Sequence, residues 1–141
     1  SPSRRASPGE HQQETCSLVL LDDCIGDIDV EKHLLIDWFE ISKMYAIVCS
    51  SISVSRFVIL YEDRFVEYDC VNRDDLLSGI IHHLEHNFIR IYLGDIHMCR
   101  MLLNARVVAL HDPIKLKADK NSEICQGKKC HLRVSRIGKI L

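Results

Sequence analysis

The alternation of apolar and polar residues predicts a series of short strands followed by one helix. Apolar residues crowd into "SLVLL" and "MYAIVCS", whereas "DIDVE" alternates with period two, as in a half-buried strand. The stretches "RFVILYE" and "RFVEYDC" predict a hairpin with Asp63 at its turn. Because "MYAIVCS" is compact and apolar throughout, we expect it to be an interior strand that is buried on both faces.

The stretch "VNRDDLLSGIIHHLEHN" predicts an amphipathic helix over about residues 73–86. Asn72 can cap its first turn, where Asp74 and Asp75 suit the positive end of the helix dipole. Leu77, Ile80, Ile81 and Leu84 form one apolar stripe, which we expect to pack on the sheet. Gly79 is unfavourable inside a helix, so we expect the helix to approach the sheet closely there.

The sequence after this helix gives weaker signals. "FIRIYLGD" predicts a strand, and "CRMLLNARVVALHDP" is compatible with a helix or a strand up to Pro113. Residues 114–130 are polar and rich in lysine, and "HLRVSRIGKIL" alternates only weakly. Residues 1–14 hold almost no apolar side chains, so we expect a disordered linker.

Composition and charge narrow the class of protein. Apolar residues make up 47% of the 141 residues, and no apolar run approaches the roughly 18 residues of a membrane span. "SPSRRASPGE" lacks the apolar core of a signal peptide, and the start at Ser1 rather than Met suggests a piece of a longer chain. Residues 1–112 hold 10 Lys and Arg against 18 Asp and Glu, a net charge of −8. Residues 113–141 hold 8 against 2, a net charge of +6.

The basic segment has two open interpretations. It can contact phosphates or an anionic membrane, and we identify Lys128, Lys129, Arg133, Arg136 and Lys139 as its candidate membrane or anion contacts. Alternatively it is a solvated tail, or a tail docked on the acidic part of its own chain. We expect no nucleic-acid partner.

Cysteines and histidines suggest neither a metal site nor a catalytic site. Seven cysteines without a signal peptide fit reduced, buried thiols of the cytosol. His82 and His86 share a helix face, but "HHLEH" lacks the HExxH order of a metalloprotease. His97, Cys99, Cys125, Cys130 and His131 contain no CxxC spacing, and neither GxSxG nor a glycine-rich phosphate loop occurs. We therefore expect no enzyme activity, no cofactor and no metal.

The order of elements follows the plan of the pleckstrin-homology-like (PH-like) superfold. This is an α+β fold in which a curved antiparallel sheet is closed by one C-terminal amphipathic helix. "SLVLLDDCIGDIDVEKHLLIDWFEISKMYAIVCS", "RFVILYEDRFVEY" and "NRDDLLSGIIHHLEHN" resemble the PH-like region near the N-terminus of large endosomal DnaJ-domain proteins. These proteins form the receptor-mediated endocytosis family, DnaJ homolog subfamily C member 13. The resemblance covers about residues 17–87 and divides the chain into a linker (1–14), a PH-like module (15–93) and a basic segment (94–141).

The resemblance implies a cytoplasmic protein that is peripheral on early endosomes. It implies recruitment to phosphatidylinositol 3-phosphate, and contacts of other parts of the full-length protein with Hsp70 and sorting nexins in retromer-linked cargo sorting. No lipid-binding residue is carried over, because Trp38 does not match the family's lipid determinants. The loop "DDCIGDIDVEK" is acidic and would repel a phosphate head group, which favours a scaffold or protein-contact role. The alternatives are a PH-like protein-interaction scaffold of another family and a small Cys/His metal-binding protein.

Overall fold

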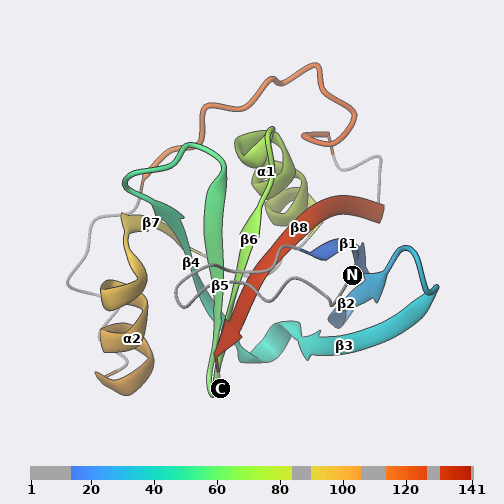
Figure 1. Cartoon of the computed structure of the whole chain (residues 1–141). Coiled ribbons are helices and arrows are strands. Elements are labelled where there is room, and N and C mark those ends of the chain that lie inside the picture. Colours follow the sequence, from blue (N-terminus) through green and yellow to red (C-terminus); the bar gives the residue numbers. More distant parts are fainter. Residues whose placement is uncertain (1–13, 84–89, 106–113, 127–130, 141) are drawn as a thin grey trace, which may run out of the picture.

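The chain folds around one eight-stranded sheet with a helix on each side (Figure 1). A computed structural model describes residues 14–83, 90–105, 114–126 and 131–140. Its strands are β1 (Glu14–Leu20), β2 (Cys24–Asp29), β3 (Leu34–Glu40), β4 (Met44–Ser50), β5 (Arg56–Tyr61), β6 (Phe65–Asp69), β7 (Arg90–Gly94) and β8 (His131–Ile140). The helices are α1 (Arg73–His83), α2 (Ile96–Ala105) and a short 3₁₀ turn, η1 (Ile41–Lys43).

The strand order is β3-β2-β1-β8-β6-β5-β4-β7. Two antiparallel meanders, β1–β3 and β4–β6, are joined by β8, which pairs with β1 on one side and with β6 on the other. All pairs are antiparallel except β4 with β7, which is parallel. The chain therefore has the expected mixture of a sheet and helices. The finer PH-like plan is not confirmed: the sheet is not closed, β7 pairs in parallel and a second helix is present.

Several local predictions are confirmed. β4 spans the predicted Met44–Ser50, and Ile47 and Cys49 face one core while Ala46 and Val48 face the other. β5 and β6 form the predicted hairpin. The helix begins at Arg73, and the amide of Leu76 donates to the carbonyl of Asn72. Residues 84–87, in which we expected the last turn of this helix, lie outside the described residues.

The larger core lies between the sheet and α1. It holds inward side chains of β1, β2, β4, β5, β6 and β8, together with Leu76, Leu77 and Ile80 of α1. Burial of these three side chains stabilises the fold by roughly 1.5–3 kcal/mol each. Ile114, Leu116 and Ile124, from the segment 114–126, pack against the same core beside α1.

The segment 114–126 is held on α1 by carboxylates of the first helical turn. Asp74 Oδ2 accepts a hydrogen bond from the Lys117 amide, and Asp75 Oδ1 accepts one from the Asp119 amide, at 2.9 and 2.7 Å. A Cβ on Gly79 would collide with the main-chain carbonyl of Ile124. The close approach expected at Gly79 is therefore made to this segment and not to the sheet.

The second helix covers the other face of the sheet beside β4, β5 and β7 (Figure 1). Met98, Cys99 and Leu102 of α2 pack on Val48, Val58 and Tyr92 among others. Asp95 precedes the helix, and its Oδ1 accepts a hydrogen bond from the Met98 amide at 2.9 Å, as an N-cap does. The ambiguous stretch is thus helical up to Ala105, and residues 106–113 lie outside the described part of the chain.

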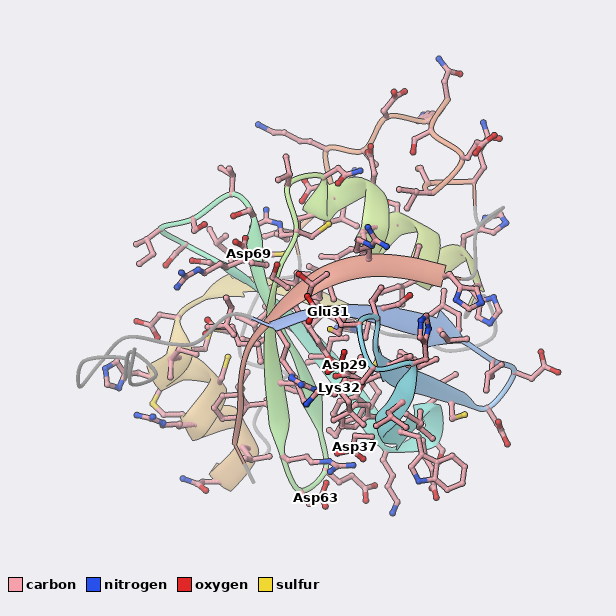
Figure 2. All side chains as sticks on the ribbon, turned by 45° about the vertical axis from the view of Figure 1, so that its right-hand side comes forward. Asp29, Glu31, Lys32, Asp37, Asp63 and Asp69 are labelled. Carbon is pink, nitrogen blue, oxygen red and sulfur yellow. The ribbon has the colours of Figure 1, made fainter. Side chains whose placement is uncertain are left out.

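The sheet curls so that its β3 end approaches the β5–β6 turn. Arg64 Nη1 donates to Asp37 Oδ2 at 3.0 Å, and the Phe39 and Tyr61 rings stack with centroids 4.6 Å apart. Figure 2 shows Asp37 near the β5–β6 turn, where Asp63 lies. Side chains, rather than a strand ladder, bring these two parts of the sheet together.

The strand β8 belongs to the segment 94–141, for which we predicted an uncertain basic tail. Its residues lie in the interior of the sheet, and Leu132, Val134 and Ile137 are buried. In the described parts of the chain, no helix is long and apolar enough to cross a membrane.

Candidate functional site

A buried charge network joins β2 to β8 inside the curl of the sheet. Asp27 is fully buried, and its Oδ2 lies 2.9 Å from Arg136 Nη1. The Tyr68 hydroxyl also donates to this oxygen, at 3.4 Å. Burial, together with the neighbouring Tyr61 and Asp27, holds the pKa of Tyr68 well above its ordinary value, so the hydroxyl keeps its proton and donates.

A second carboxylate stands directly opposite the first. Asp27 of β2 and Asp37 of β3 are cross-strand partners in the ladder, an arrangement that is destabilising for like charges. Arg136 binds Asp27 and Arg64 binds Asp37, so each carboxylate has its own guanidinium. Arg64 also lies over the Phe39 ring, 4.5 Å from its centroid. These two pairs hold the β1–β3 meander against the rest of the sheet.

The β1–β3 meander exposes apolar side chains on the face opposite the larger core. We call this surface the open face and define it by the exposed Leu35 and Trp38, the half-buried Val19 and Ile28, and the buried Gly26 between them. Their cross-strand pairing places Trp38 beside Gly26 and Val19, and Leu35 beside Ile28. A Cβ on Gly26 would touch Leu35 Cδ1 at 3.5 Å and Val19 Cβ at 3.9 Å, which shows that the surface is continuous.

The open face is strongly exposed at its β3 side. Leu35 is 61% exposed and Trp38, the only tryptophan of the chain, is 63% exposed. Leu34 and Ile36 of the same strand are also exposed. A contiguous apolar surface of this kind is typical of an interaction site in a soluble protein.

Hollows of opposite charge flank the open face. At the β1–β2 turn, a hollow of about 360 Å³ is lined by Asp22, Asp23, Glu40 and Trp38 among others. Toward the β2–β3 turn and β8, a larger hollow of about 540 Å³ is lined by Ser17, His33, His131 and Arg133 with Ile28 and Val30. We call them the acidic hollow and the basic hollow.

The turn between β2 and β3 shapes the rim of the basic hollow. Asp29 Oδ1 accepts hydrogen bonds from the amides of Glu31 and Lys32, both at 3.0 Å, and these three residues lie together in Figure 2. The turn ends at His33, whose φ of 52° is in the left-handed region. This turn brings His33 to the same hollow as His131 and Arg133.

The structure separates the five predicted membrane contacts. Arg133 is exposed and lines the basic hollow, next to Ser17 in the β1–β8 ladder. The Arg136 side chain is only 13% exposed and is bound to Asp27, so it is engaged inside the sheet. Lys139 lies on β8, whereas Lys128 and Lys129 lie outside the described residues.

Histidines and cysteines do not assemble into a metal site among the described residues. His82 is exposed, and His83 Nε2 lies 3.1 Å from the Leu21 carbonyl; His86 lies outside the described part. Five cysteines of the described ranges are buried, namely Cys16, Cys24, Cys49, Cys70 and Cys99. Burial raises the pKa of Cys49 to about 11, so this thiol is protonated at neutral pH.

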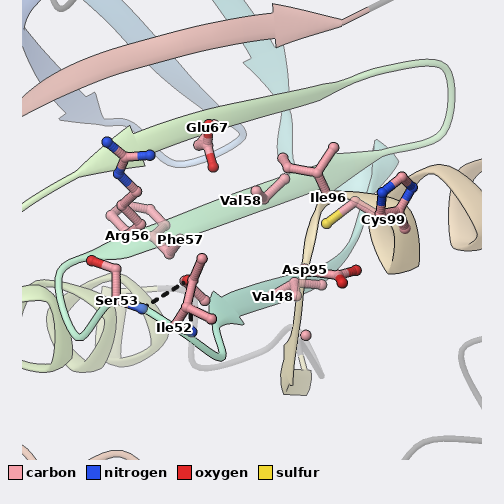
Figure 3. A pocket seen from close by; sticks show the side chains of 13 residues that line it. Val48, Ile52, Ser53, Arg56, Phe57, Val58, Glu67, Asp95, Ile96 and Cys99 are labelled. Carbon is pink, nitrogen blue, oxygen red and sulfur yellow. Dashed lines mark hydrogen bonds between the residues drawn. The ribbon is translucent and has the colours of Figure 1, made fainter. Parts of the chain in front are cut away.

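A cavity of about 270 Å³ lies between α2 and the sheet (Figure 3). Val48, Val58 and Ile96 supply apolar walls, and Arg56 and Glu67 lie on the strands at its rim. Cys99 also lines this cavity. Burial, with smaller contributions from Glu67 and Asp95, raises the pKa of the Cys99 thiol to about 12. Cys99 is therefore not a nucleophile at neutral pH.

Comparison of the chain with family models, with curated proteins and with solved structures finds no match. Trp38 and Leu35 were not predicted from the sequence as candidate contact residues. The available signal was "HLLIDWF", in which apolar residues occupy consecutive positions and so reach both faces of an edge strand.

Proposed function

We propose that this chain is a non-enzymatic, PH-like interaction module of an endosomal DnaJ/Hsp70 cochaperone. Its role is in membrane trafficking at early endosomes, in retromer-linked cargo sorting. The module contacts the anionic endosomal membrane, which carries phosphatidylinositol 3-phosphate. Other parts of the full-length protein recruit Hsp70 and sorting nexins.

The PH-like assignment is supported by the order of elements in the first part of the chain. Antiparallel strands from β1 to β6 are followed at once by α1, whose apolar side packs inside the curl of the sheet. Arg73 ties the start of α1 to the carbonyls of Ser53 and Arg56, and His83 lies by the Leu21 carbonyl at its other end. Arg73 to Ser78, which belong to the stretch that resembles the endosomal DnaJ-domain family, begin this helix.

The basic hollow carries the membrane proposal. Arg133 and the two histidines line this concave surface, and the described residues that line it include no carboxylate, with Asp29 and Glu31 standing in the turn at its rim. Lys128 and Lys129 lie three and two positions before His131 in the sequence, outside the described residues, and we propose them as further membrane contacts. Each basic residue near an anionic surface contributes about 1 kcal/mol, so three of them give weak, reversible attachment.

The test is co-sedimentation with liposomes of matched charge, with and without phosphatidylinositol 3-phosphate. We expect binding that follows total negative charge and fades as salt shortens the Debye length. Changing Lys128, Lys129 and Arg133 together to Gln should weaken it, by roughly fivefold per residue. Arg100→Gln, an exposed change on α2, is the matched control and should bind like the unchanged protein.

Two results would contradict the proposal. One is equal binding of the triple variant and the unchanged protein to anionic liposomes. The other is the absence of the tagged chain from early endosomes in cells, where it should colocalise with phosphatidylinositol 3-phosphate and be released by the triple change.

A further inference from the structure

We propose that the open face docks an amphipathic helix of a partner protein, with a Lys or Arg side chain of that helix in the acidic hollow. This inference goes beyond membrane attachment, because it concerns the apolar and acidic side of the face rather than the basic hollow. The partner is defined by chemistry: an apolar stripe flanked by basic residues.

The apolar part of the face fits the width of one helix. Neighbouring strands lie about 4.8 Å apart, so β1, β2 and β3 together span about 10 Å, close to the diameter of an α-helix. The same side of the sheet is already covered by α2 at its β4–β5–β7 part (Figure 1). A second helix on the β1–β3 part would bury Leu35 and Trp38 as α2 buries Val48 and Val58.

The free edge of β3 is less suited to pairing with an added strand. The ladder shifts register between Asp27 and Ile28, and such an irregularity disturbs strand addition. The Trp38 amide donates to Asp37 Oδ1 at 2.8 Å, and the Trp38 carbonyl accepts from Arg64 Nη2 at 3.4 Å. Side chains thus occupy both main-chain groups of Trp38, in the middle of the edge that an added strand would pair with. Docking on the face avoids this competition.

Charge selects a basic partner. Asp22, Asp23 and Glu40 surround the hollow beside Trp38, and only Glu40 has an ion-pair partner among the described residues, a long contact of 3.9 Å with exposed Lys43. A guanidinium or ammonium group in this hollow would meet carboxylates and an indole side chain together, a combination that binds cations.

Trp38 makes the docking directly measurable, because it is the only tryptophan. The probe is a designed 14-residue amphipathic peptide of Leu and Lys, with a Leu and Glu peptide of the same pattern as the charge control. We expect the Lys peptide to shift Trp38 emission to shorter wavelength and to shield it from acrylamide. The Glu peptide should do neither.

Variants locate the site. Leu35→Ser and the double change Asp22→Asn with Asp23→Asn should each weaken binding of the Lys peptide about tenfold. Leu93→Ser is the matched control, because Leu93 on β7 is 52% exposed and lies at the opposite edge of the sheet. Equal affinity of the Leu35→Ser and Leu93→Ser variants, or no emission shift at all, would overturn the proposal.

Two further measurements distinguish other possible occupants of the open face. Anionic vesicles that shift Trp38 emission as strongly as the Lys peptide would assign the face to lipid and overturn helix docking. A concentration-dependent shift without any peptide, with a dimer in sedimentation, would assign it to a second copy. Loss of liposome binding in the Lys128, Lys129 and Arg133 variant, with peptide binding intact, would separate this inference from the membrane proposal.

Discussion

At the scale of single residues, the buried carboxylate of Asp27 forms an ion pair with Arg136. Its countercharge, Arg136, comes from a strand 109 residues further along the chain. Transfer of a carboxylate into a protein interior is costly, and the charged pair offsets that cost only while both groups are present. Arg136 is therefore a structural residue, although its charge alone made it a candidate for membrane contact.

We expect Arg136→Met to lower the free energy of unfolding by about 3–5 kcal/mol, because it leaves Asp27 charged and without its countercharge. The double variant with Asp27→Asn should recover much of that loss. Arg133→Met, an exposed change on the same strand, should stay within about 0.5 kcal/mol of the unchanged protein. Urea denaturation of the four proteins measures all of these values. If the two single changes have equal effects, the Asp27–Arg136 pair does not stabilise the fold.

Thiol reactivity and alkaline stability should follow the buried cysteines. Burial raises the pKa of Cys49 to about 11 and that of Cys99 to about 12, from an ordinary value of 9.0. From about pH 9 up to these raised pKa values, the unfolded chain loses thiol protons that the folded chain keeps. The free energy of unfolding should therefore fall as the pH rises above about 9. Melting temperatures measured from pH 7 to 11 test the sign.

Labelling gives an independent measurement of the same burial. At pH 8 a thiol reagent should modify the partly exposed Cys125 in the native protein but leave Cys49 and Cys99 unmodified until denaturant is added. Rapid native labelling of Cys49 would contradict its placement in β4.

Burial of Cys49 was predictable from the sequence, but the role of Arg136 was not. A compact apolar run such as "MYAIVCS" determines its own burial through local composition. The ion pair of Arg136 depends on which strands become neighbours, and periodicity within β8 carries no information about β2. For the same reason the exposure of Leu35 and Trp38 could not be predicted, because it follows from the edge position of β3 in the sheet.

At the scale of elements, α1 is shaped by the segment that lies on it. Replacement of Gly by Ala inside a helix normally stabilises the helix by about 1 kcal/mol. Gly79→Ala should nevertheless destabilise this protein by about 1–3 kcal/mol, because the added methyl meets the Ile124 carbonyl. Ser78→Ala, its half-buried neighbour, is the control and should be far milder. Urea denaturation gives the stabilities, and limited proteolysis should show faster cleavage within residues 114–126 in the Gly79 variant. A stabilised Gly79→Ala protein would contradict this packing.

Whether a segment forms a helix or a strand was predictable where its apolar residues follow one clear spacing, and was ambiguous elsewhere. The β5–β6 hairpin and the start of α1 at Arg73 follow from alternation and from the acidic first turn. For residues 96–105 the apolar content fitted either state, and packing on β4, β5 and β7 determined the helix. Apolar and polar residues alternate only weakly along β8, because Arg136 is directed inward and the ladder with β6 shifts register between Glu67 and Tyr68.

At the scale of the whole molecule, β8 joins two meanders that make no other continuous ladder with each other among the described strands. A version that ends at Gly127 should lose cooperative urea unfolding and should bind a hydrophobic dye, because the paired edges of β1 and β6 are exposed. A synthetic peptide covering residues 128–141 should restore the transition, whereas a scrambled peptide of the same composition should not. Unaltered cooperative unfolding of the shortened version would show that β8 is dispensable.

The same strand has a consequence during synthesis. A ribosome releases residues 14–105 long before β8 emerges, and the β1–β3 and β4–β7 parts then have apolar edges with no partner strand. Domains that depend on such late, distant pairings expose aggregation-prone edges while they wait. The nascent chain therefore has a period in which it is itself a suitable client for a molecular chaperone.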